Sequence, residues 1–66
     1  MKNFNRNMLP ILGVNWFYFA KESDALALAR WAKRETRNSQ RPCRATVKVC
    51  DDRPFFERYE VKISNW

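Results

Sequence analysis

The chain of 66 residues contains no histidine, only one glycine and only two cysteines. Histidine is the side chain that enzymes use most often as a general base near neutral pH. The lone glycine, Gly13, cannot build a glycine-rich loop that cradles phosphates. Neither Cys43 nor Cys50 has a histidine to activate it, and the pair lacks the further ligands of a zinc site. These absences predict a protein that is not an enzyme and holds no metal or cofactor.

The two cysteines are also poorly placed for a disulfide. They lie seven residues apart in one predicted strand, which separates their Cα atoms by over about 20 Å. A disulfide requires Cα atoms within about 7 Å. We therefore expect free thiols, a reducing compartment and a cytoplasmic location.

Long hydrophobic runs are scarce as well. The apolar run at residues 8–20 follows Lys2 and Arg6, as the core of a signal peptide would, but Pro10 and Asn15 interrupt it. No small-residue cleavage motif follows the run. It is also shorter than the roughly 20 residues that a membrane-spanning helix needs. We expect neither a cleaved leader nor contact with a membrane.

Acidic residues are few, with seven Asp and Glu against thirteen Lys and Arg, so that the formal charge is +6. A field of this sign attracts nucleic acid or the acidic surface of another protein. Ten residues are aromatic, namely three Trp, two Tyr and five Phe. Their large side chains provide the buried area that such a short chain needs.

The sequence divides into a flexible N-terminal arm at residues 1–12 and a single domain at residues 13–66. Residues 14–21 contain four consecutive aromatic side chains and no Gly or Pro, which predicts a strand. A helix is expected from residue 25 to about 37, with Ser23 or Asp24 as its N-cap. At 100° per residue, one face of this helix is apolar. Its members are Ala25, Leu28, Ala29, Trp31 and Ala32. The opposite face carries Arg30, Lys33, Arg34 and Arg37.

Two further strands are predicted at residues 43–50 and 55–63, joined by a turn at residues 51–54. The first alternates cleanly between small apolar and polar residues, which is typical of a half-buried strand. In the second, Glu57 falls on the face that is otherwise apolar. The predicted fold is α+β, with the order β-α-β-β and one helix packed on one face of a three-stranded, mainly antiparallel sheet.

A single helix leaves the other face of the sheet uncovered, and this face is the candidate binding site. The last two strands give it Arg44, Lys48, Phe56, Arg58 and Lys62. The first strand adds an aromatic pair, either Trp16 with Tyr18 or Phe17 with Phe19. Cations between exposed rings are typical of surfaces that bind single-stranded nucleic acid. The basic helix face with Arg30, Lys33 and Arg37 is a second candidate.

The stretch FAKESDALALARW at residues 19–31, with Arg41, Pro42 and Cys43 further on, resembles the strand-into-helix segment of small phage inhibitors of bacterial RNA polymerase. Those inhibitors are of about this length and of strand-helix-strand-strand build, and several anti-CRISPR proteins are similar in size and layout. The resemblance implies a phage or mobile-element accessory protein that blocks a host nucleic-acid machine. For a phage-encoded chain the expected location is the cytoplasm of the host cell. This chain departs from the polymerase inhibitors in charge, because they rely on acidic surface, and no binding residue is carried over.

Three hypotheses follow. The first is an inhibitor whose basic, aromatic face docks on a host protein or nucleoprotein complex, such as a CRISPR effector or RNA polymerase. The second is a module that binds DNA or RNA directly through the same face. The third is a homodimer in which the aromatic face is the dimer seam.

Overall fold

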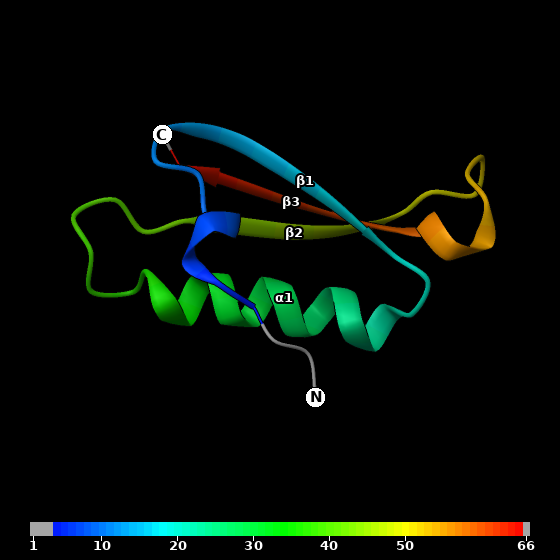
Figure 1. The fold of residues 1–66 in the computed structure, drawn as a ribbon, viewed down its shortest axis with the longest axis horizontal. Helices are drawn as coiled ribbons and strands as arrows, with labels where there is room; N and C mark the ends of the chain where they lie inside the picture. Colours follow the sequence, from blue (N-terminus) through cyan, green and yellow to red (C-terminus); the bar gives the residue numbers. More distant parts are fainter. Residues whose placement is uncertain (1–3, 66) are drawn as a thin grey trace.

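The computed structural model describes residues 4–65, in which one α-helix packs on one face of a three-stranded antiparallel sheet (Figure 1). In chain order the elements are the 3-10 turn η1 (Arg6–Met8), strand β1 (Gly13–Phe19), helix α1 (Glu22–Glu35), strand β2 (Arg44–Val49), the 3-10 turn η2 (Phe55–Glu57) and strand β3 (Tyr59–Asn65). The predicted β-α-β-β order and α+β class are confirmed.

The central strand of the sheet is β3, the last in the chain, and both neighbours run antiparallel to it. In this register, Val61 lies between Phe17 of β1 and Val47 of β2. Val61 and Ile63 are fully buried. Since residues paired across antiparallel strands point to the same face, these positions define the side of the sheet that faces the helix.

Helix α1 buries the predicted apolar stripe. Ala25, Leu28, Ala29 and Ala32 are buried, and the partly buried Trp31 packs against the same cluster. The predicted N-cap is wrong, however, because the helix begins at Glu22 and its N-cap is Lys21, whose side chain makes no capping bond. Glu22 and Asp24 lie in the first turn instead, where negative charge suits the helix dipole.

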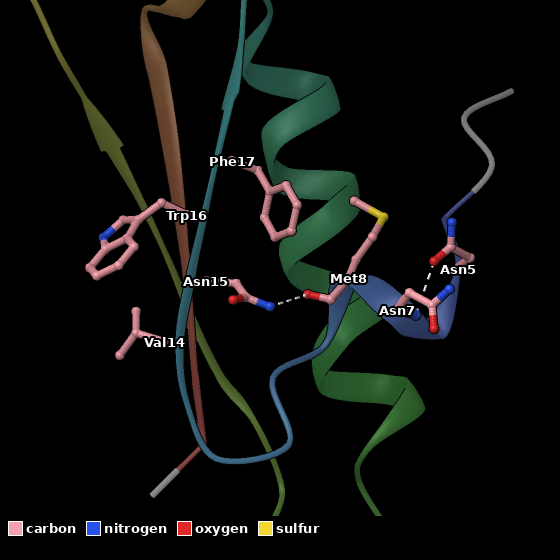
Figure 2. Close-up of a pocket in the computed structure, with 7 residues that line it drawn as sticks. All are labelled: Asn5, Asn7, Met8, Val14, Asn15, Trp16 and Phe17. Atoms are coloured by element: carbon pink, nitrogen blue, oxygen red, sulfur yellow. Dashed lines mark hydrogen bonds between the residues drawn. The ribbon is translucent and has the colours of Figure 1, made fainter.

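The segment before β1 is packed rather than free from residue 4 onward, and residues 1–3 lie outside the described part of the chain. The Phe4 ring lies 5.5 Å from the Trp31 ring, and Met8 packs against the core. Arg6 Nη1 lies 2.8 Å from Glu35 Oε1. Because α1 packs mainly on β2 and β3, β1 needs another cover for its apolar side chains. Figure 2 shows Met8 beside Phe17, in the position of that cover.

The start of the last strand was predicted too early. Residues 55–57 form η2, in which the Glu57 amide donates to the Pro54 carbonyl at 2.8 Å, and Arg58 is helical in its backbone. The strand begins only at Tyr59, where pairing with β2 begins, and continues to Asn65. Glu57 therefore lies outside the sheet, which explains why it did not fit the predicted alternation.

Thr36 joins the end of the helix to the start of β2. Its hydroxyl donates to the Ala32 carbonyl at 2.8 Å and accepts from the Cys43 amide at 2.9 Å, and the residue is buried. The hydroxyl thus satisfies a buried backbone N–H that no strand partner reaches. A buried N–H left without a partner costs about 1–3 kcal/mol.

We therefore expect Thr36→Val to lower the free energy of unfolding by about 1–3 kcal/mol, because valine keeps the shape of the side chain but leaves the Cys43 amide unpaired. Urea denaturation followed by circular dichroism measures the change. Thr36→Ser keeps the hydroxyl and is the control, with a smaller loss. Equal midpoints for the valine variant and the wild type would show that the hydroxyl contributes nothing.

Candidate functional site

The side of the sheet turned away from the helix is open to solvent, and we call it the outer face. Its residues occupy the alternate positions of the three strands and pair in three rows across the sheet. The rows are Val14–Ser64–Arg44, Trp16–Lys62–Thr46 and Tyr18–Glu60–Lys48. Lys62, on the central strand, therefore has Trp16 on one side and Thr46 on the other.

The register decides which aromatic pair of β1 lies on this face. Phe17 and Phe19 pack against the core on the helix side. Trp16 and Tyr18 therefore belong to the outer face. Figure 2 shows the Trp16 indole on the side of β1 opposite to Phe17. The outer face thus carries rings as well as charge.

Charge on the outer face is mainly positive. The exposed side chains of Arg44, Lys48 and Lys62 are cationic, and the half-buried Glu60 is the carboxylate of the three rows. Glu60 pairs directly with Lys48, so it offsets the cation at that end. In the row of Trp16, Lys62 and Thr46, no carboxylate offsets the positive charge of Lys62. This middle of the face suits an anionic ligand.

Of the two rings on the outer face, one is already in contact with another side chain and the other is exposed to solvent. The Arg53 guanidinium lies 4.2 Å from the centre of the Tyr18 ring, which is a cation–π contact. Arg53 Nη1 also lies 3.8 Å from Glu57 Oε2. The connection from β2 to β3 thus folds over that end of the face. Trp16 is 53% exposed, so it is the ring available for stacking.

Phe56 and Arg58, predicted on the outer face, lie elsewhere. Both precede β3, Phe56 within η2 and Arg58 as its C-cap, so strand alternation does not place them. Phe55 and Phe56 are 73% and 58% exposed, with their rings edge to face at 5.8 Å. They form an apolar tip beside the outer face rather than a part of it.

The basic helix residues form a second group, which we call the helix cation cluster. Arg30, Lys33, Arg34 and Arg37 are all exposed and together line one shallow hollow. Arg30, Lys33 and Arg34 lie three and four residues apart within α1, which places them on one side of the helix, and Arg37 follows directly after the C-cap Thr36. The structure therefore brings together the four residues predicted on the basic helix face, namely Arg30, Lys33, Arg34 and Arg37.

A wider hollow lies along the free edge of β1 (Figure 2). It is lined by Asn5, Asn7, Met8, Val14, Asn15, Trp16 and Phe17. Two of its amides already serve the fold. The Asn15 Nδ2 donates to the Met8 carbonyl at 3.1 Å, and the Asn5 Oδ1 accepts from the Asn7 amide at 2.9 Å. These bonds hold the N-terminal segment against β1.

Two residues that local sequence pattern does not predict at the site are placed there by the fold. Arg53 lies in the connection after β2, and nothing local indicates that it folds back over Tyr18. Ser64 joins the outer face because β3 runs past its predicted end. Within residues 4–65, no three His, Cys, Asp or Glu side chains gather as metal ligands would. The helices of the described residues are too short or too polar to cross a bilayer.

The comparisons with known proteins add no relative to this picture. No protein-family model, no curated protein sequence and no solved structure matches the chain.

Proposed function

We propose that this chain is a non-catalytic protein that binds single-stranded nucleic acid through the middle of its outer face. The observation that carries the proposal is a half-exposed Trp16 that lies directly beside Lys62 on an open sheet face. A half-exposed tryptophan leaves apolar surface in contact with water. No contact within the described residues explains why this surface is exposed. The cytoplasm, where nucleic acid is accessible, is the compartment that suits this function.

The chemistry of the face matches this ligand. Bases stack on an exposed ring whatever their sequence, while cations follow the phosphates. Arg44 and Lys48 lie four positions apart on β2, which separates their Cα atoms by about 13 Å. They can therefore contact different phosphates of a strand whose base stacks on Trp16.

Trp16→Ala is expected to weaken binding of a single-stranded oligonucleotide by about 5- to 150-fold, because stacking of one base contributes about 1–3 kcal/mol. Fluorescence anisotropy of a labelled oligonucleotide at low salt measures the dissociation constant. Trp16→Phe, which keeps a ring, is the control and retains most of the affinity. Because the side chain is exposed, thermal melting should show both variants folded. Equal affinity of the alanine variant and the wild type would remove Trp16 from the interface.

A second candidate function is inhibition of a host nucleic-acid-handling complex, such as a CRISPR effector or RNA polymerase. The exposed tip of Phe55 and Phe56 favours it, since large aromatic side chains are enriched in the hot spots of protein interfaces. The same titration separates the two candidates. An inhibitor of this kind binds no oligonucleotide at low salt, and it retains a stoichiometric protein partner in a nuclease-treated bacterial lysate.

A further inference from the structure

The helix cation cluster is a concentration of positive charge that the fold does not use. Among the described residues, none of Arg30, Lys33, Arg34 and Arg37 forms an ion pair. Glu35, the carboxylate nearest to the cluster in the sequence, is held by Arg6 at 2.8 Å. The four cations therefore repel one another on one side of the helix without a local counter-charge.

The helix dipole explains only part of this arrangement. Lys33 and Arg34 lie in the last turn of α1, where cations are favourable by about 0.3–1 kcal/mol. The dipole effect fades within one turn of the helix end. Arg37 lies just beyond the C-cap, within one turn of the helix end, but Arg30 lies further inside the helix. Arg30 thus gains little from the dipole.

The cluster belongs to helix α1, which lies on the side of the sheet opposite to the outer face. Helix α1 covers the other face of the sheet (Figure 1), and the cluster residues are on its exposed side. The molecule measures 36 × 25 × 15 Å along its principal axes. A strand stacked on Trp16 therefore lies on the far side of the sheet from helix α1. The two basic surfaces belong to different layers of the fold, one to the sheet and the other to the helix.

From this placement we propose that the helix cation cluster is a second site for nucleic acid, one that binds phosphates, so that one molecule bridges two nucleic-acid segments. The proposal rests on the proposed function of the outer face. The cluster contains only Lys and Arg, which gives strong, salt-sensitive attraction to a phosphate backbone and no selection among bases. The two sites thus differ in kind, since only the outer face contains a ring that stacks.

Energy transfer between a donor-labelled and an acceptor-labelled single-stranded oligonucleotide tests the bridge. As wild-type protein is added at low salt, transfer should rise and then fall when excess protein gives each oligonucleotide its own molecule. The variant K33Q/R37Q is expected to reduce the maximum of transfer by about ten-fold, because two phosphate contacts are lost. Glutamine suits the helix nearly as well as lysine and arginine. The variant K21Q/R41Q removes two cations outside both sites and should bridge as the wild type does.

The outcomes separate this proposal from the proposed function. Loss of transfer in K33Q/R37Q, with anisotropy binding of a single oligonucleotide still dependent on Trp16, supports the bridge. Trp16-dependent binding without any transfer in the wild type overturns the bridge and leaves the proposed function standing. Equal loss of transfer in K21Q/R41Q and K33Q/R37Q overturns it too, because net charge alone would then explain the transfer. Absence of all oligonucleotide binding overturns both proposals.

Discussion

Replacing Leu28 with alanine is expected to destabilise the domain strongly. Leu28 is one of the largest fully buried side chains in the described residues. Removal of such a side chain costs about 2.7–5 kcal/mol. A chain of this length has a free energy of unfolding of only about 3–10 kcal/mol. The substitution therefore removes from about a quarter to all of the stability of the domain.

The same helix offers a matched control for this experiment. Leu26 is 37% exposed and lies two residues away on another side of α1. Leu26→Ala makes the same chemical change, and because leucine and alanine differ little in helix propensity, we expect a loss below about 1 kcal/mol. Urea denaturation followed by circular dichroism compares the two variants with the wild type. Similar losses in both would mean that the Leu28 side chain is not the centre of the core.

Local pattern predicts well those elements in which the buried residues recur at a single period along the chain. The helix stripe around Leu28 repeats at the helical period, and the alternation of β2 places Ala45 and Val47 toward the helix, where they pack. In both cases the hydrophobic effect acts on a regular element, so periodicity in the sequence indicates the buried side.

Other parts of the fold depend on contacts that no local pattern contains. Asn5 and Asn7 give the N-terminal segment a polar appearance, yet Phe4 and Met8 pack against the core because α1 covers β1 only in part. That cover depends on where the helix lies over the sheet. It is a tertiary requirement, and the spacing of residues 4–12 alone does not show it.

The candidate site likewise combines residues that local pattern predicts with residues that only tertiary contacts place. Alternation along β1 pairs Trp16 with Tyr18 and Phe17 with Phe19, but both pairs are aromatic, so composition does not indicate which pair faces the helix. Pairing of Phe17 with the buried Val61 decides it. Proline at position 54 begins a 3-10 turn rather than a strand, since it fixes φ and donates no hydrogen bond. This turn displaces Phe56 and Arg58 from the predicted face.

A charge reversal on the outer face distinguishes a localised binding site from a general effect of net charge. The double reversal R44E/K62E is expected to weaken binding of a single-stranded oligonucleotide by at least about 100-fold at low salt, because it removes two phosphate contacts and adds two repulsive charges. The slope of the logarithm of affinity against the logarithm of salt concentration should also fall by about two. Fluorescence anisotropy across a salt series measures both quantities.

The control for this reversal is K21E/R41E, which lowers the formal charge of +6 by the same four units. Lys21 precedes α1, and Arg41 lines a hollow with Thr36 and Cys43, on the helix side of the sheet. Outer-face binding requires R44E/K62E to lose far more affinity than the control, and the control to keep nearly the full salt slope. If the two variants lose affinity equally, the protein responds to total charge, and the row of Trp16 and Lys62 has no special part in binding.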